Sequence, residues 1–233
     1  MTVQRTESVR TQDGEFDLKI WSPAGGGPAV LVIQEIFGVG DYIEAVAADL
    51  VGLGYVAAAP DMFWRLRPGW RAGHDDEGLA ESMDLAGRYD PATGITDVAA
   101  AFDHLSRLPE VTGGVAVLGF CFGGTVAFAS AAEITPAAVL SFYGSGVPAQ
   151  LDLLDRITAP LQLHFGGQDP YIPAEKVADV AAAVEGRPNV ELHIQPDGGH
   201  AFHNRVAPRF YQPEPAERAW ALAVRFLERH LRG

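Results

Sequence analysis

One cysteine of this chain stands in a setting typical of a reactive nucleophile. The apolar run from Val115 to Leu118 stops at Gly119; Cys121 and Gly123 follow at alternate positions. This G-x-nucleophile-x-G spacing is typical of a sharp turn from a strand into a helix, and the small residues let that turn close. A helix dipole beginning at this point favours a thiolate. The pattern therefore predicts that Cys121, the only cysteine, is a nucleophile rather than an inert buried thiol.

A nucleophilic cysteine needs a base, and the base needs a group that orients it. Asp169 comes soon after the apolar run 161–165, and His200 follows the run 190–194. If both runs are strands, their carboxyl ends meet at the edge of the sheet where sites form. We therefore expect Cys121 as nucleophile, His200 as base and Asp169 as the orienting acid. Asp197 is a second candidate acid, ranked lower because it shares a short loop with His200.

Two backbone amides are expected to hold a developing oxyanion. One is the N–H of Phe122, directly after the nucleophile, and the other is the N–H of Ile36, after the apolar run 29–33. Glu35 lies beside them, and a carboxylate at an apolar site is unfavourable without a partner. The residues leave three interpretations of Glu35 open: it pairs with the thiol, it pairs with an arginine, or it is simply solvated.

A metal site is not expected. His200 and His203 are close in sequence, but no other group of ligand-type residues accompanies them. The sequence predicts no metal and no cofactor.

The elements that must position these residues alternate between strands and helices. Buried or half-buried strands are predicted at 16–21, 29–33, 55–59, 115–119, 137–143, 161–165 and 190–194, and helices at 43–53, 93–108, 173–184 and 214–231, with a further helix after Cys121. This alternation predicts a single α/β domain over residues 1–233, with a mostly parallel sheet covered by helices on both faces. The stretch 65–92 interrupts the alternation, and two interpretations remain open: a lid or binding loop with a short helix at 79–88, or a solvated insertion.

Composition narrows the class of protein. Seventeen basic and thirty acidic residues give a net charge of −13, which argues against binding to nucleic acids or anionic membranes. A lone cysteine cannot form an internal disulfide, and the N-terminal residues contain no apolar signal segment, so a cytoplasmic location is expected. No apolar run is long enough to span a membrane. The sequence is compatible with a monomer or a homodimer.

Several motifs together resemble one enzyme family. They are Gln34-Glu35-Ile36-Phe37-Gly38, Pro60-Asp61-Met62-Phe63, Gly119-Phe120-Cys121-Phe122-Gly123-Gly124, Phe142-Tyr143-Gly144, Gly166-Gly167-Gln168-Asp169 and Gly199-His200-Ala201-Phe202. They are similar to the motifs of dienelactone hydrolases, also called carboxymethylenebutenolidases, over roughly residues 15–230. The resemblance implies an α/β-hydrolase fold and a triad of Cys121, His200 and Asp169. It also implies that Glu35 contacts the resting thiol and helps to deliver the thiolate when substrate binds.

The expected substrate pocket departs from that family. Members that act on dienelactone hold the substrate carboxylate with two arginines, whereas Asn204 stands at one of those positions here, with Arg205 beside it. Arg205 or Arg71 could supply the missing charge. Apolar pocket walls are expected from aromatic residues. The complete predicted pocket set is Phe37, Phe63, Trp64, Tyr143, Ala201, Asn204 and Arg205.

The sequence thus predicts a hydrolase that cleaves a lactone or an activated ester through an acyl-enzyme on Cys121. Its expected partner is a small lactone or ester. A broad carboxylesterase or thioesterase of the same fold is one alternative. A non-catalytic redox-sensing thiol protein is another, although no second cysteine is present to resolve a sulfenic acid. A third is a protein of this fold that has lost activity and only binds a ligand.

Overall fold

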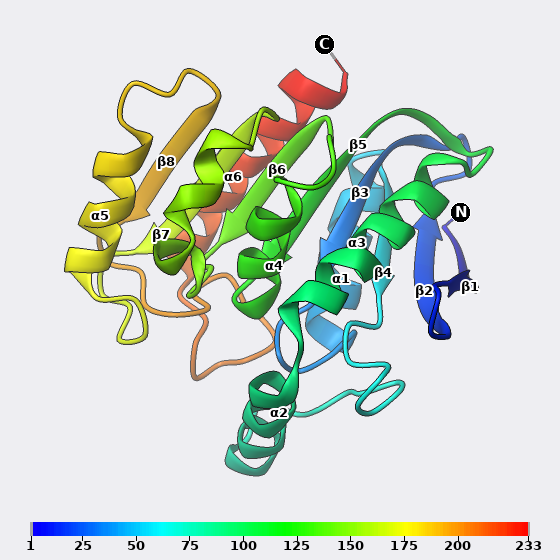
Figure 1. The fold of residues 1–233 in the computed structure, drawn as a ribbon, viewed down its shortest axis with the longest axis horizontal. Helices are drawn as coiled ribbons and strands as arrows, with labels where there is room; N and C mark the ends of the chain where they lie inside the picture. The colour runs from blue at the N-terminus through cyan, green and yellow to red at the C-terminus, as the bar shows by residue number, and fades with distance from the viewer. Residues whose placement is uncertain (1, 233) are drawn as a thin grey trace.

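The computed structural model of the protein describes residues 2–232, which form one eight-stranded sheet in the order β1-β2-β4-β3-β5-β6-β7-β8 (Figure 1). The pairings β1–β2 and β2–β4 are antiparallel and all others are parallel. The strands are β1 (Val3–Arg10), β2 (Glu15–Ser22), β3 (Gly27–Ile33), β4 (Val56–Pro60), β5 (Val111–Phe120), β6 (Ala138–Phe142), β7 (Leu161–Gly166) and β8 (Val190–Gln195). The predicted α/β-hydrolase fold, with its mostly parallel sheet, is confirmed.

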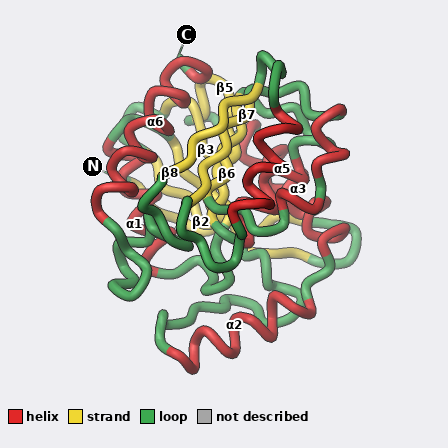
Figure 2. Tube along the Cα trace, turned by 90° about the vertical axis from the view of Figure 1, so that its left-hand side faces the viewer, coloured by secondary structure: helices red, strands yellow, loops and turns green. Residues whose placement is uncertain are grey.

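Helices cover both faces of the sheet. Seen along the edge of the sheet, α1 and α6 lie on one side, α3 and α5 lie on the other, and α2 stands apart at one end (Figure 2). α4 packs on the same face as α3 (Figure 1). The helices are α1 (Asp41–Gly52), α2 (Asp76–Arg88), α3 (Pro91–Ser106), α4 (Phe122–Ser130), α5 (Ala174–Val184) and α6 (Pro213–Leu231), with two short 3₁₀ turns at Val147–Ala149 and Leu151–Asp155.

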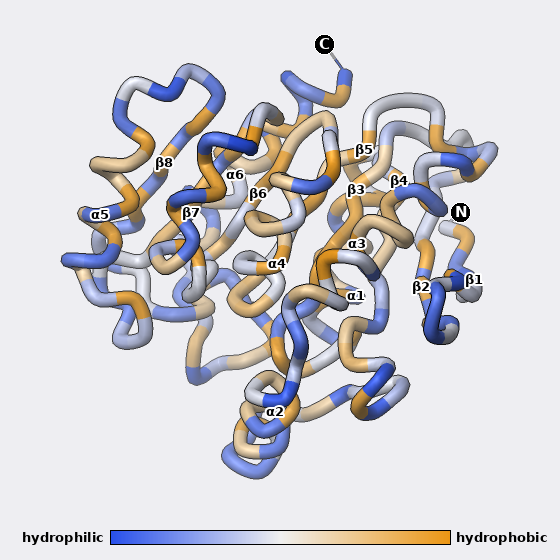
Figure 3. Tube along the Cα trace, viewed as in Figure 1, coloured by the Kyte–Doolittle hydropathy of each residue, from blue (hydrophilic) through white to orange (hydrophobic). Residues whose placement is uncertain are grey.

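The central strands are apolar because both of their faces are covered. Every residue of β4 and β6 is buried, and β3 contains the continuous run 29–33 (Figure 3). Burial on both faces is the physical reason that parallel strands show runs of apolar residues rather than an alternating pattern. The apolar core therefore lies in the middle of the sheet and beneath the helices on each side.

Strand register brings the loops of the expected site together. Ile33 of β3 pairs with Gly119 of β5, and Phe120 of β5 pairs with Phe142 of β6. These strands run parallel, so the segments that follow them leave the sheet at the same edge. Glu35, Cys121 and Tyr143 all lie just beyond this edge.

The interruption at 65–92 contains a longer helix than expected. α2 spans Asp76–Arg88, and the side chain of Asp75 caps it by accepting from the N–H of Gly78.

Within residues 2–232, no helix has the length and apolar character needed to cross a membrane.

Candidate active site

The turn at Cys121 is strained and tightly packed. Cys121 has φ 53° and ψ −115°, an unusual conformation for any residue other than glycine. A Cβ atom on Gly119 would lie 1.9 Å from the carbonyl oxygen of Gly123, and one on Gly123 would lie 2.3 Å from that of Ile33. Only glycine fits at these two positions. The turn therefore fixes Cys121 at the N-terminus of α4 with its thiol half-buried.

His200 lies between the thiol and a carboxylate. Its Nε2 is 3.0 Å from Sγ of Cys121, and its Nδ1 donates to Oδ2 of Asp169 at 2.7 Å. Burial alone would lower the pKa of His200, but Asp169 and Cys121 outweigh it and raise the pKa to about 10. The three residues come from the loops after β5, β7 and β8, and the structure brings them together.

Asp169 is fixed by its own loop. Its side chain is fully buried, and Oδ1 accepts from the backbone N–H groups of Tyr171 and Ile172 at 2.8 and 3.2 Å. The rival acid is placed elsewhere, because Asp197 forms a half-exposed ion pair with Arg218.

Three non-glycine residues in the described chain have positive φ, and all are at this site. They are Cys121, Tyr143 with φ 40°, and Ala201 with φ 54°. The ring of Tyr143 packs 5.4 Å from that of His200, and Ala201 directly follows His200. Backbone strain concentrates where functional groups are held in fixed positions.

The loop after β3 forms another wall. Ile36 and Phe122, the expected oxyanion donors, both line the same cavity as Cys121. The indole N–H of Trp70 donates to the carbonyl of Ile36 at 3.1 Å, and the backbone N–H of Ala72 donates to the carbonyl of Phe37. The segment after Asp61 therefore holds this loop in place.

Glu35 is buried, and its partner is an amide. Nδ2 of Asn204 donates to Oε2 of Glu35 at 2.7 Å and lies 3.0 Å from Nε2 of His74. Burial raises the pKa of Glu35 to about 7, although His200, Asn204 and Tyr143 act in the opposite direction. Among residues 2–232, no side chain or backbone group forms a hydrogen bond with Oε1 of Glu35.

The resemblance implied that Glu35 contacts the resting thiol, and the hydrogen bonds among residues 2–232 differ from that expectation. Sγ of Cys121 is bonded to His200, whereas the carboxylate of Glu35 is held by Asn204. The local reason is that fully buried Asn204 supplies an amide donor to Oε2 of Glu35.

His203 does not take part in a metal pair with His200. It is buried among aromatic rings, its Nδ1 is 2.8 Å from the hydroxyl of Tyr42, and burial lowers its pKa to about 3. Within the described residues no group of three or more His, Cys, Asp or Glu side chains is arranged to hold a metal ion.

A cavity of about 440 Å³ opens over Cys121. Its walls come from the loop after β3, from α2, α3 and α4, and from the loops after β6, β7 and β8. The lining residues are Glu35, Ile36, Phe37, Leu79, Met83, Ala86, Tyr89, Pro91, Ile95, Cys121, Phe122, Thr125, Val126, Ala129, Ser145, Gly146, Gln150, Tyr171, His200, Ala201 and Phe210.

Only part of the predicted pocket set lines this cavity. Phe37 and Ala201 do so. Phe63 instead packs with Trp70 in a separate small apolar cluster, and the indole N–H of Trp64 donates to Asp97. Neither residue lines the cavity: the ring of Phe63 packs 5.2 Å from that of Phe122, which does, and the ring of Trp64 packs 5.9 Å from that of Phe16.

Three further members of the set also lie outside the lining. Tyr143 is fully buried behind His200, and Asn204 is buried behind Glu35. Arg205 turns away and forms an ion pair with Asp49 at 2.5 Å.

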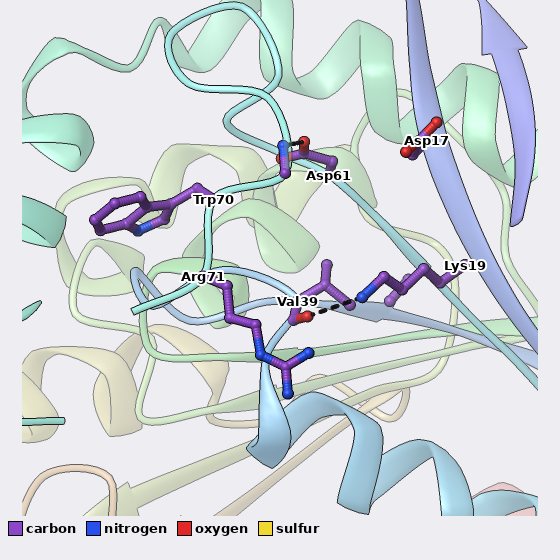
Figure 4. A pocket seen from close by; sticks show the side chains of 8 residues that line it. Asp17, Lys19, Val39, Asp61, Trp70 and Arg71 are labelled. Carbon is purple, nitrogen blue, oxygen red and sulfur yellow. Dashed lines mark hydrogen bonds between the residues drawn. The ribbon is translucent and has the colours of Figure 1, made fainter. Parts of the chain in front are cut away.

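Arg71, the other arginine considered for a carboxylate site, is also held elsewhere. Its guanidinium pairs with Asp41 and with Glu44. Figure 4 shows Arg71 beside a separate small cavity of about 60 Å³, near Lys19 and Asp61. The carboxylate of Asp61 accepts from the N–H groups of Phe63 and Gly69, so this region anchors the segment that supports the loop after β3.

Sequence reasoning missed several residues that line or support the site. The ring of His74 packs against that of Phe37 at a tilt of 49° with centroids 4.3 Å apart, and Tyr171 packs 4.9 Å from His200. Nothing in the local sequence marks either residue. A signal did exist for the floor of the cavity, since Phe122, Val126 and Ala129 follow helical spacing after the nucleophile.

Known proteins similar in sequence to this chain match it over most of its length. A carboxymethylenebutenolidase from a Pseudomonas species is 34% identical over 218 residues, covering 93% of this chain and 91% of that protein. The carboxymethylenebutenolidase of Pseudomonas putida is 31% identical over 198 residues, covering 84% of each.

Solved structures share the fold. The dienelactone hydrolase of Anabaena variabilis superposes with a TM-score of 0.73 at 20% identity, covering 99% of both chains. A dienelactone hydrolase-like promiscuous phosphotriesterase from metagenomic libraries superposes with a TM-score of 0.82 at 23% identity, again covering 99% of both.

The sequence profile of the dienelactone hydrolase family matches residues 16–231, which include every loop that lines the cavity over Cys121. The protein therefore belongs to the dienelactone hydrolase family and has the fold of an α/β-hydrolase.

Proposed function

We propose that the protein hydrolyses a lactone or an activated ester through an acyl-enzyme formed on Cys121. The observation that carries the proposal is the line of hydrogen bonds from Asp169 through His200 to Cys121, at 2.7 and 3.0 Å, at the floor of a cavity. Membership of a hydrolase family supports the reaction class.

Acylation begins with the thiolate of Cys121. Because the pKa of His200 is raised to about 10, its imidazolium lies beside the sulfur, where a positive charge stabilises a thiolate nucleophile. Sγ attacks the carbonyl carbon, and the carbonyl electrons move to oxygen. We expect the backbone N–H groups of Ile36 and Phe122, both residues of the cavity lining, to stabilise that oxyanion.

Collapse of the tetrahedral intermediate expels the leaving oxygen, and His200 gives its proton to it. The neutral imidazole then removes a proton from water, which attacks the thioester, and the thiolate and imidazolium are restored. Asp169 holds Nδ1–H of His200, so that Nε2 faces the sulfur and the leaving group throughout.

The test uses a p-nitrophenyl ester and three forms of the enzyme. Wild type is expected to give a burst of nitrophenol, steady turnover and a transient acyl adduct on Cys121 by mass spectrometry. Cys121→Ala is expected to fold and to show no turnover. Cys121→Ser is expected to lose at least a hundredfold in kcat/KM, because the site stabilises a thiolate and a hydroxyl ionises far less readily. Turnover by Cys121→Ala within a few-fold of wild type would refute the proposal.

The same experiment separates the proposal from a redox role. A redox-sensing thiol would react with peroxide to give a sulfenic acid and would not turn over the ester. A ligand-binding protein without activity would show neither the burst nor the adduct.

A further inference from the structure

We propose that the acyl group of the substrate is an uncharged, apolar chain that lies along α4 beneath α2 and α3, with the leaving group on the opposite side of Cys121. The inference rests on the proposed function and names the substrate class and its orientation.

The cavity continues past the nucleophile as a groove whose floor is one face of α4. Phe122, Thr125, Val126 and Ala129 all line it, and their i, i+3, i+4, i+7 spacing places them on a single helix face. Since α4 begins next to Cys121, this face leads away from the sulfur. The seven helical steps from Phe122 to Ala129 extend the groove by about 10 Å, the length of an extended chain of about eight carbon atoms.

The position of His200 decides which part of the ester occupies the groove. His200 comes from the loop after β8, three strands from β5 on one side, whereas α3 packs over β3 and β5 on the other side (Figure 1). His200 must reach the leaving oxygen to protonate it, so the leaving group lies on its side, near Tyr171. The acyl group is then directed toward Ile95 of α3.

Along α4 the groove offers no cationic partner for a negative charge on that chain. Among the described residues lining the cavity no lysine or arginine is present, and the ionisable ones are Glu35, Tyr89, Cys121, Tyr171 and His200. The other polar side chains of the lining, Thr125, Ser145 and Gln150, are uncharged. Arg205 and Arg71 are engaged in ion pairs outside the cavity. A carboxylate on the chain would therefore be desolvated without a cation along α4 to offset the cost.

The rim of the whole cavity is apolar as well, on both sides of Cys121. Met83 of α2, on the side of the groove, is 57% exposed, and Tyr171, on the side of His200, is 59% exposed, and both line the cavity. They are two of the four large apolar side chains that are exposed in the described residues. Apolar groups at an open mouth are typical of a binding site for apolar ligands.

The experiment measures kcat/KM for p-nitrophenyl esters from acetyl to decanoyl, with one leaving group throughout. Wild type is expected to prefer octanoyl over acetyl by at least tenfold. It is also expected to prefer the hexanoyl ester by at least tenfold over the adipoyl half-ester, which carries a carboxylate at the end of its chain. A second series with constant acetyl and lengthening alcohols is expected to vary by less than threefold.

Three variants locate the effect. Ala129→Leu fills the far end of the groove and is expected to lower the octanoyl-to-acetyl ratio at least tenfold. Ala86→Leu narrows the wall formed by α2 and is expected to lower it in the same direction, which keeps the test valid if Ala129→Leu folds poorly. Ala80→Leu is the matched control, because Ala80 is exposed on the same helix and does not line the cavity.

The outcomes are distinguishable. A flat acyl series, a preference for the adipoyl half-ester, or an equal effect of Ala80→Leu and Ala86→Leu would overturn the inference while leaving ester hydrolysis intact. If kcat/KM depended on the length of the alcohol and not on the length of the acyl chain, the proposed orientation would be reversed. That result would also overturn the inference. Failure of the proposed function has another signature: no ester of either series is hydrolysed, and Cys121 carries no acyl group.

Discussion

At the scale of single residues, strain and hydrogen bonding converge on His200. Cys121, Tyr143 and Ala201 hold backbone conformations that cost on the order of 1–3 kcal/mol each. Cys121 forms a hydrogen bond with His200, and the ring of Tyr143 packs against the ring of His200. Ala201 is the next residue of the chain. These strained conformations lower the stability of the folded protein, and they fix the imidazole of His200 between the sulfur of Cys121 and the carboxylate of Asp169.

We predict that His200→Ala lowers kcat/KM by about a thousandfold and that Asp169→Asn lowers it by about a hundredfold, as members of one unit. Asp197→Asn is the control, because Asp197 pairs with Arg218 at the surface. Ester kinetics on the three purified variants test this. If Asp197→Asn were the most damaging change, the orienting acid would have been assigned to the wrong residue.

We predict that Glu35→Gln gains stability over wild type as the pH rises. Burial raises the pKa of Glu35 from its ordinary 4.5 to about 7, so the folded protein holds this proton more tightly than the unfolded chain. Protonated Glu35 makes its full contribution to the stability of the wild-type protein below pH 4.5. This contribution is lost as the pH rises through 7 and the carboxyl group ionises in the folded protein. The difference in unfolding free energy should therefore grow by on the order of 3 kcal/mol across this window.

Urea unfolding of both proteins between pH 4.5 and 8 measures this difference. Buried His203 titrates in both, so its contribution cancels in the comparison. A constant difference across the range would mean that Glu35 titrates normally. On the same variant, the pH profile of Cys121 alkylation is expected to lose a step near pH 7, because ionised Glu35 interacts with the charge on His200.

At the scale of elements, two glycines set how closely α4 approaches the sheet. A Cβ atom at Gly119 or Gly123 would collide with backbone oxygens, as described above. Backbone atoms cannot move aside as a flexible side chain can, so the elbow tolerates no larger residue.

We predict that Gly123→Ala destabilises the protein by at least about 2 kcal/mol and lowers activity, because α4 must shift away from β3. Gly87→Ala is the matched control. Gly87 lies within α2, and a Cβ atom there would meet nothing within 4 Å. That substitution should stabilise the protein by about 0.5–1 kcal/mol through higher helix propensity. Thermal unfolding of both variants tests the pair, and an unchanged melting temperature for Gly123→Ala would contradict the packing argument.

Strands with an apolar run or an apolar–polar alternation were predictable from the sequence, and a strand with neither was not. The runs at 29–33 and 161–165 are β3 and β7. β1 was missed because Val9 is its only buried residue, so its strand character comes from pairing with β2 and not from burial.

The site shows the same division. The motif around Cys121, together with Asp169 and His200 at strand ends, indicated which residues would meet. The pocket walls were not predictable, because aromatic character does not distinguish Phe63, buried in its own cluster, from Phe37, which lines the cavity. Phe63 packs with Leu85 of α2, and no local sequence pattern determines where α2 lies.

At the scale of the whole molecule, the charge of −13 acts on any ionised substrate. The positive side chains that could offset it near the site, Arg205 and Arg71, are paired with carboxylates. A long-range field of this sign lowers the encounter rate for anions, and salt screens it.

We predict that kcat/KM for a lactone carrying a free carboxylate is at least tenfold below that of its methyl ester at low ionic strength. The gap should narrow as salt rises from ~10 mM to ~0.5 M, because screening helps only the anion. Arg205→Ala should leave the ratio unchanged. A large advantage for the free acid that disappears in Arg205→Ala would instead reveal a carboxylate site formed by rearrangement.

The detached position of α2 also bears on how such an enzyme diversifies. The helix stands away from the sheet (Figures 1 and 2), yet Leu79, Met83 and Ala86 form one wall of the substrate cavity. Substitutions on this wall can reshape the cavity with little disturbance to the strands whose following loops carry Cys121, Asp169 and His200. Under the proposed function, selection can thus explore new substrates through α2 while the arrangement of these three residues is inherited unchanged.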